Sequence, residues 1–571
     1  MLTGDNRVLV IGLDGMGTDA LAHIFARGAM PRLAALAARG VRGTLKSTVP
    51  PCTCPAWPTM CTGVGPGRHG VFSFVFRGET VKKGPGPFSG GTGGVRLSSA
   101  TDLAAPRFWQ LAARAGRRAA VLFVPTMFPA DAVEPLAVSG YPAPDRAGAS
   151  AVYPPAAEEA LRQAIPEFQA SPALPFAARP GESRHEAHAR AIRDAAAADA
   201  HRVTTAFDHA LAGGRQSAEV THGRDEGGAI DLAMVVFSFP DHLFHSHYAC
   251  VLAPDDAPGP VLAMRRVADE ALGRIDDALG RIIERFGDPA TVLVVSDHGF
   301  AAKRGSVHVA ECLAQAGLLA PAGIGFLLKR LFRRRRTADA GLVLVADDPW
   351  TDPGLDWNRT RAFPGYDHEQ GVFVNLRGRN PRGIVGPKEY GAVIESARQA
   401  LLAVRDPATG DRPVRAARRR DEIYSGPYVD RAPDILVELA DGWQVRRKLS
   451  WRMRGRPPVS RHAGLGGVHH PDGILLAAGP AVKAGAAGTE AQMADIAATV
   501  LALAGLAPAG PLDGRPLDEV FMLPAARQTV RLDGPVPGAA SGFAKATPDR
   551  SGYSEADENE VARRLEDLGY L

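Results

Sequence analysis

Residues 291–299 read TVLVVSDHG, an almost wholly apolar run that ends in the adjacent polar residues Asp297 and His298. Short apolar runs rich in valine are typical of strands that are buried on both faces of a parallel sheet. Two polar side chains at the end of such a strand need partners, because burying them unpaired costs free energy. This stretch therefore predicts an α/β fold with a functional site at the end of a buried strand.

Three other segments run an apolar strand into polar residues in the same way: VLVIGLDG (8–15), AMVVFSFPDHLFH (233–245) and GGVHHPDGILLAAG (466–479). Ligands bind outside the carboxyl ends of the strands in open α/β sheets. We therefore expect a three-layer sandwich, in which helices cover both faces of a central, mostly parallel sheet. The polar residues expected to meet at its site are Asp14, Asp241, His245, Asp297, His298 and His469.

The wide spacing of these residues predicts one catalytic domain over residues 1–523. Its core is expected at about 1–130, 225–325 and 456–523, with insertions at about 131–224 and 340–455 that cap the site. Residues 524–571 are expected to form a linker rich in Pro, Gly, Ser and Thr, followed by a short helix with Ser554 as its N-cap.

The composition argues against several classes of partner. Lysine and arginine total 66 against 62 acidic residues, which is too near balance to indicate a nucleic-acid partner. No apolar run approaches the roughly 20 residues of a membrane span, and the apolar stretch before Asp14 is shorter than that of a secretory signal. Five cysteines without a CxxC pair fit reduced thiols, so we expect a cytoplasmic protein.

A basic stretch, LLKRLFRRRR (327–336), carries an apolar face of leucine and phenylalanine. Such a run is more often a solvated helix face or loop. Peripheral membrane contact through residues 326–336 is the alternative.

The strand-end residues have the side chains that bind metals. Asp14 by itself could be a helix N-cap, whereas the four-residue spacing of Asp241 and His245 places both on one face of a helical turn. Mixed imidazole and carboxylate ligation suits Zn²⁺, with Mn²⁺ or Fe as competitors. Two such ions act as a clamp for in-line displacement at phosphorus. We therefore predict two divalent metal ions.

A nucleophile is offered by the segment CTCPAW, residues 52–57. If the hydroxyl of Thr53 binds one ion, its pKa falls and it can attack as the alkoxide. The alternative is that Thr53 only starts a helix behind Pro51. For the flanking Cys52 and Cys54 we favour small, half-buried side chains over a redox or metal-binding role.

Residues 8–80, the surroundings of Asp241, and the motifs VVSDHG and GVHHPDG resemble the type I phosphodiesterase/nucleotide pyrophosphatase branch of the alkaline phosphatase superfamily. The resemblance extends to about residue 520. It implies a covalent phospho-threonine intermediate that water hydrolyses. It also implies one ion surrounded by Asp14, Thr53, Asp297 and His298, and another held by Asp241, His245 and His469.

The chain departs from this family at one position. The nucleotide pyrophosphatases have an asparagine there that donates to a phosphate oxygen, and here the residue is Ala56. Backbone N–H groups near Thr53 and Cys54, or the side chain of His470, are candidate replacements in substrate binding. Relatives that cleave sulfate esters carry a cysteine where Thr53 stands, so sulfatase chemistry is not expected.

The sequence thus predicts hydrolysis of a small-molecule phosphate ester, either a diester or a monoester, by Thr53. One alternative is a phosphotransferase that hands the phosphoryl or phosphoalcohol group to an acceptor other than water. Another is a metal-stabilised binding protein without turnover.

Overall fold

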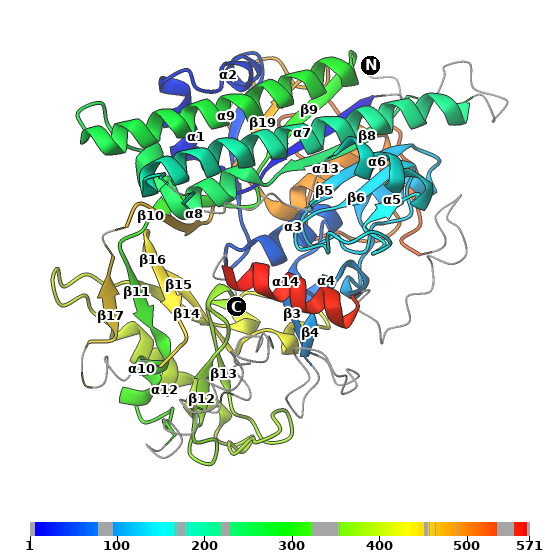
Figure 1. Cartoon of the computed structure of the whole chain (residues 1–571). Coiled ribbons are helices and arrows are strands. Elements are labelled where there is room, and N and C mark those ends of the chain that lie inside the picture. The colour runs from blue at the N-terminus through cyan, green and yellow to red at the C-terminus, as the bar shows by residue number, and fades with distance from the viewer. Residues whose placement is uncertain are drawn as a thin grey trace. The chain divides into compact units, whose positions relative to one another are not determined.

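A computed structural model gives the structure of the protein (Figure 1). It describes residues 6–77, 95–165, 168–169, 178–179, 181–218, 229–322, 352, 354–449, 455, 457–462, 464–486, 488–533 and 553–567. The chain divides into two compact units. Unit 1 comprises Met1–Gly65, Ser99–Ala302 and Leu465–Thr547, and unit 2 comprises Pro66–Ser98, Lys303–Gly464 and Pro548–Leu571.

Unit 1 is built on a nine-stranded sheet with the strand order β20-β2-β19-β9-β1-β8-β5-β6-β7. Strands β9, β1, β8, β5 and β6 run parallel to one another at its centre, whereas β19 is antiparallel to both of its neighbours. The bounds are β1 Arg7–Leu13, β2 Val41–Lys46, β5 Ala119–Val124, β6 Pro135–Ser139, β7 Val152–Tyr153, β8 Leu232–Phe237, β9 Ala290–Val295, β19 Asp472–Ala478 and β20 Glu490–Gln492.

Helices cover both faces of this sheet. One layer consists of α1 Thr18–Ala26, α2 Pro31–Ala38, α6 Glu158–Ala164, α7 Arg184–Ala218, α8 Phe239–Val251 and α9 Gly259–Phe286, with α7 and α9 side by side (Figure 1). The other consists of α3 Thr53–Thr62, α5 Phe108–Arg114 and α13 Met493–Leu503. Successive side chains of a strand point to opposite faces, so Leu9 and Ile11 pack in the first layer while Val8 and Val10 pack in the second. The predicted three-layer α/β sandwich is confirmed.

Three smaller features complete the described part of unit 1. Strands β10 Gly299–Ala302 and β18 Gly467–His470 pair antiparallel, and β21 Leu506–Pro508 pairs with β22 Gln528–Val530. Short 3₁₀ helices cover Ala100–Asp102 and Pro155–Ala157.

Unit 2 has a core of its own, formed by two small sheets and the helices against them. The sheets have the orders β12-β13-β15-β14 and β16-β11-β17, and a separate pair is β3-β4. The strand bounds are β3 Val75–Arg77, β4 Val95–Leu97, β11 Gly305–His308, β12 Ala362–Pro364, β13 Gly371–Val374, β14 Val414–Arg419, β15 Ile435–Leu439, β16 Trp443–Arg446 and β17 Val459–Arg461. The helices are α4 Pro66–His69, α10 Val309–Gln315, α12 Tyr390–Leu402 and α14 Glu555–Asp567, with 3₁₀ turns at Asp367–Glu369, Arg420–Glu422 and Val429–Arg431.

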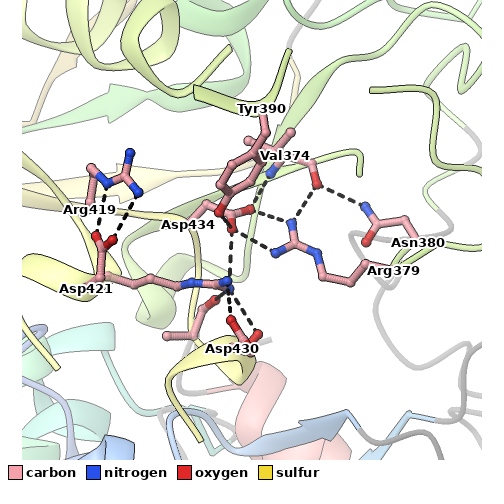
Figure 2. A network of polar contacts seen from close by, with 10 residues as sticks. Val374, Arg379, Asn380, Tyr390, Arg419, Asp421, Asp430 and Asp434 are labelled. Carbon is pink, nitrogen blue, oxygen red and sulfur yellow. Dashed lines mark hydrogen bonds and ion pairs between the residues drawn. The ribbon is translucent and has the colours of Figure 1, made fainter. Parts of the chain in front are cut away.

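The buried carboxylate of Asp434 forms hydrogen bonds to several residues of unit 2 (Figure 2). Asp434 is 1 % exposed. It accepts hydrogen bonds from Arg379 Nη1 at 2.8 Å, from the hydroxyl of Tyr390 at 2.6 Å and from the backbone N–H of Val374 at 2.7 Å. Burial by itself raises the pKa of Asp434, but these donors outweigh burial and hold that pKa below its usual value. The negative charge of Asp434 is therefore compensated by hydrogen-bond donors, and its role is structural.

Several sequence expectations concern segments outside the sheet centre. Residues 131–224 were expected to cap the site, whereas β6 and β7 extend the central sheet and α7 packs on it. The short strand between Glu134 and Gly140 lacks a long apolar run, which is why the sequence did not reveal it.

Ser183 caps α7 by accepting the N–H of Glu186, and Ser554 caps α14 by accepting that of Asp557. One catalytic domain over 1–523 stays a prediction.

The remaining expectations concern the surface and the thiols. The basic stretch 326–336 and most of the expected linker lie outside the described residues. Across the described parts of the chain, no helix is long and apolar enough to cross a membrane. All five cysteines are buried free thiols. The cytoplasmic location stays a prediction.

Candidate active site

The strand-end residues of unit 1 gather outside the carboxyl ends of the central strands. Asp14 follows β1, and Asp297 and His298 follow β9. Asp241 lies in the first turn of α8, directly after β8, and His245 lies one helical turn further on. The other two members are Thr53, the first residue of α3, and His469 of β18.

One part of the cluster surrounds the imidazole of His298. Its Nε2 atom lies 3.3 Å from Thr53 Oγ1, 3.2 Å from Asp297 Oδ2 and 3.9 Å from Asp14 Oδ1. His298 Nδ1 lies 3.1 Å from the backbone carbonyl of Gly299 and donates its proton there. Nε2 is therefore the basic nitrogen, and it accepts a hydrogen bond from the Thr53 hydroxyl.

The other part surrounds the carboxylate of Asp241. Its Oδ1 atom lies 3.4 Å from His245 Nε2 and 3.6 Å from His469 Nε2, and these two nitrogens are 3.0 Å apart. The parts adjoin each other, because Asp241 Oδ1 is 3.9 Å from His298 Nε2 and the rings of His298 and His469 stack at 3.7 Å between centroids. The side chain of His245 is 24 % exposed and that of Asp241 only 6 %, so solvent reaches the cluster beside His245.

Three carboxylate oxygens in this cluster lack hydrogen-bond donors. Asp14 Oδ1, Asp241 Oδ1 and Asp297 Oδ2 are buried and accept no hydrogen bond from the described residues. Buried carboxylates without donors are costly unless a cation neutralises them. Two groups have ligand atoms within 4.8 Å of one another, Asp14 with Asp297 and His298, and Asp241 with His298 and His469. Oxygen and imidazole donors of this kind fit divalent metal ions.

The electrostatics of the cluster also reflect uncompensated negative charge. Burial, and then repulsion from Asp241, raises the pKa of Asp297 to about 7. Burial, followed by repulsion from the carboxylates of Asp297 and Asp241, raises the pKa of Asp14 well above its usual value. Burial acts in the same direction on Asp241, but the imidazoles of His245, His469 and His298 outweigh it and lower the pKa of that carboxyl. Acids with strongly shifted pKa values are typical of functional sites.

Two contacts that the sequence did not reveal orient these ligands. The indole Nε1 of Trp57 donates to Asp14 Oδ2 over 3.2 Å, and His469 Nδ1 donates to the carbonyl oxygen of Pro51 over 3.0 Å. The second contact turns the basic Nε2 of His469 towards Asp241. Trp57 lies one helical turn after Thr53 in α3. This spacing is the only feature of the local sequence that places Trp57 on the same helix face as Thr53.

Two glycines of the first motif make room for the site. A Cβ at Gly12 would lie 2.5 Å from the Trp57 ring, so this position lets the indole approach β1. Gly15 has a φ of +74°, and a Cβ there would lie 2.7 Å from the Phe300 ring and 3.1 Å from Asp241 Cα. Larger residues would displace Trp57 or the start of α8.

The two positions expected on the substrate side, Cys54 and His470, and the position that departs from the family, Ala56, lie in different surroundings. Cys54 is fully buried in the first turn of α3, and Ala56 is fully buried in the apolar layer below it. His470 follows His469 in β18, so its side chain points to the opposite side of that strand. Its Nδ1 accepts the backbone N–H of Asp472 at 3.2 Å. The structure therefore does not bring His470 into the cluster.

Solved structures that match the fold of this chain include those of two hydrolases. Murine ectonucleotide pyrophosphatase/phosphodiesterase 5 is 15 % identical with a TM-score of 0.42, over 89 % of this chain and 97 % of that one. Phosphonoacetate hydrolase from Sinorhizobium meliloti is 14 % identical with a TM-score of 0.45, over 86 % of this chain and 94 % of that one. No curated protein sequence matches the chain.

A family model described as type I phosphodiesterase/nucleotide pyrophosphatase matches residues 8–472. The matched range includes all seven residues of the cluster, from Asp14 to His469, together with the strands and helices that position them. The chain therefore belongs to this family of phosphate ester hydrolases.

Proposed function

We propose that this protein hydrolyses a small-molecule phosphate ester, diester or monoester, with the hydroxyl of Thr53 as the nucleophile. The observation that carries the proposal is the position of that hydroxyl, which is hydrogen-bonded to the buried His298 within a cluster of three buried carboxylates and three imidazoles. A hydroxyl beside a base and metal-binding side chains is the usual arrangement of an activated nucleophile.

We assign two divalent ions to the cluster, most simply Zn²⁺, with Mn²⁺ or Fe as competitors. Asp14, Thr53, Asp297 and His298 would hold one ion, and Asp241, His245 and His469 the other. The carboxylate oxygens without donors support this assignment. When bound, the ions would supply Lewis-acid stabilisation of the charge on the phosphoryl oxygens.

The reaction would proceed in two displacements at phosphorus. Thr53 Oγ1 forms a bond to phosphorus while the bond to the leaving alcohol breaks, and the threonine carries the phosphoryl group. Water then attacks phosphorus, the bond to Oγ1 breaks, and the hydroxyl is restored. Thr53 begins α3, so the partial positive charge at the start of this ten-residue helix favours the phosphoryl group there.

The phosphate contacts of this protein would differ from those of nucleotide pyrophosphatases. Ala56 supplies no donor, and it is fully buried. We propose that backbone N–H groups near Thr53 and Cys54 contact the phosphoryl oxygens instead. A structure of the mouse ectonucleotide pyrophosphatase/phosphodiesterase 5 in an inactive form contains AMP, so nucleotides belong in a substrate panel for this chain.

The experiment is to compare Thr53→Ala with the wild-type protein on bis-p-nitrophenyl phosphate and p-nitrophenyl phosphate. Loss of the nucleophile should lower kcat at least roughly 1,000-fold. Thr59→Ala is the matched control, because Thr59 is buried in the same helix and its hydroxyl donates to the carbonyl of Pro55 at 2.8 Å. Unchanged thermal unfolding would establish that Thr53→Ala is folded.

Undiminished hydrolysis by Thr53→Ala would overturn the mechanism. Adding alcohols as competing acceptors separates hydrolysis from transfer. A phosphotransferase would give more transfer product than free phosphate or monoester. A binding protein would retain metal and turn over neither substrate.

A further inference from the structure

The three-stranded sheet β16-β11-β17 of unit 2 has one apolar face and one polar face. Val307, Val445 and Val459 pack together in the core of unit 2. Successive residues alternate between faces, so the opposite face carries the side chains of Ser306, His308, Gln444, Arg446 and Ser460. This face contains hydroxyl, imidazole, amide and guanidinium groups, and none of the five residues is acidic.

Two cationic side chains converge on a single neutral oxygen of this face. With the amide of Gln444 oriented to satisfy its neighbours, the side-chain oxygen lies 3.2 Å from Lys303 Nζ and 3.0 Å from Arg446 Nε. The same oxygen lies 3.0 Å from Ser306 Oγ. The ammonium and the guanidinium are thus held close together although like charges repel.

The acidic groups around them do not balance both cations. Asp367 Oδ2 lies 3.1 Å from Arg446 Nη1, and Asp367 Oδ1 accepts the backbone N–H of Arg447 at 2.7 Å. Within the described chain, no carboxylate lies within ion-pair distance of Lys303. Burial, followed by repulsion from Arg446, lowers the pKa of Lys303, although attraction to Asp367 acts in the opposite direction. A further negative charge at this place would be stabilising.

Two imidazoles flank the cations. His308 Nε2 lies 2.9 Å from Ser460 Oγ, and its buried Nδ1 has no hydrogen-bond partner in the part of the chain that the structure describes. His462, at the end of β17, reaches over the sheet so that its Nε2 lies 3.2 Å from Ser306 Oγ. The face therefore combines surplus positive charge with a buried ring nitrogen that no group of the described residues satisfies.

We propose that this face, defined by Lys303, Ser306, His308, Gln444, Arg446 and His462, binds a phosphate group, either as inorganic phosphate or as a phosphate monoester. A lysine ammonium acts on phosphate as a point charge, whereas an arginine presents a forked pair of donors. A phosphate between them would relieve their mutual repulsion. None of these residues belongs to the Thr53 cluster, so this inference goes beyond the proposed hydrolysis and does not depend on it.

The test is a calorimetric titration of the full chain with inorganic phosphate. Lys303→Gln and Arg446→Gln each remove one charged donor, and each should weaken binding about 10-fold or more. Lys388→Gln is the matched control, because Lys388 is an exposed lysine elsewhere in unit 2, and it should bind phosphate as the wild type does. Equal affinity in the wild type and both site variants, or no binding to the wild type, would overturn the proposal.

A second measurement needs no variant and locates the bound ion. Reductive methylation of the wild-type protein, read out by mass spectrometry, should modify Lys303 several-fold more slowly when phosphate is present, while Lys388 reacts at an unchanged rate. Equal modification of Lys303 with and without phosphate would contradict the assignment. Activity of Thr53→Ala, which tests the hydrolase proposal, has no bearing on either result.

Discussion

The indole nitrogen of Trp57 donates a hydrogen bond to Oδ2 of Asp14 over 3.2 Å. The other oxygen of the same carboxylate is buried without a donor and faces His298 at 3.9 Å. The hydrogen bond from Trp57 thus fixes the orientation of the Asp14 carboxylate. Its Oδ2 accepts from the indole, and its Oδ1 faces the cluster. A group that orients a metal ligand in this way changes metal affinity without touching the ion.

We expect Trp57→Phe to weaken metal binding about 10- to 100-fold, because Asp14 loses the donor that orients it. Competition with a fluorescent chelator measures the affinity. The matched control is Trp109→Phe, which removes a buried indole from the same side of the sheet. The Nε1 of Trp109 donates to Asp131, outside the cluster, at 2.7 Å. Equal losses of metal affinity in both variants would mean that the contact with Asp14 has no specific role.

A buried ion pair positions the helix that carries Asp241. Asp199 is fully buried, accepts the backbone N–H of Phe239 at 2.8 Å and pairs with Arg202, which is 2 % exposed. Asp199→Asn removes the carboxylate that pairs with this buried guanidinium, while the charge of Asp145 still acts on Arg202, so we expect a loss of about 1–3 kcal/mol in the free energy of unfolding. Urea denaturation measures this change.

Glu270→Gln provides the comparison for Asp199→Asn. Glu270 pairs with Arg193, which lies in α7 as Asp199 does, and the side chains of Glu270 and Arg193 are both over 40 % exposed. Exposed pairs contribute about 0–1 kcal/mol. A destabilisation of Asp199→Asn no larger than that of Glu270→Gln would be inconsistent with a structural role for the buried pair.

Acid should destabilise the protein through His69 of unit 2. Burial lowers the pKa of His69 to about 3, whereas an imidazole in the unfolded chain takes up a proton near pH 6.5. The unfolded state therefore binds more protons between these values. The stabilisation is complete above about pH 6.5 and is lost at about 1.4 kcal/mol per pH unit as pH falls towards 3.

Denaturation at a series of pH values measures this effect. His69→Gln should have a shallower dependence on pH than the wild type, while His23→Gln, which changes a side chain that is 45 % exposed, should follow the wild type. Identical slopes for His69→Gln and the wild type would exclude His69 as the source.

The sequence predicted the parts of unit 1 that depend on short-range patterns. The apolar runs before Asp14, Asp241 and Asp297 indicated buried parallel strands, and the topology of such sheets brings their ends together. The spacing of Asp241 and His245 was sufficient to place both on one helical face. These patterns each cover about ten residues or fewer, and the topology of a parallel sheet is known in advance. The sequence was therefore sufficient to predict that these residues lie together.

Other features depend on contacts between distant segments and leave no local pattern. The approach of Trp57 to Asp14 requires a glycine at position 12 in another element. The separation of His470 from the cluster follows from strand alternation, but only once residues 467–470 are known to form β18. The polar face of unit 2 combines strands from residues 305–308, 443–446 and 459–461, whose register no single segment specifies.

The place of β19 in the sheet has a consequence for how the protein is made. Strand β2 joins the sheet only through β19 and β20, whose residues lie more than four hundred positions later in the chain. During synthesis the amino-terminal parts of a chain emerge from the ribosome first. Strand β2 precedes the helix that begins at Thr53, so the chain before this helix is paired in the sheet only once residues 472–478 have been translated. A nascent chain that stalls before that point would carry the candidate nucleophile with the strand before it still unpaired.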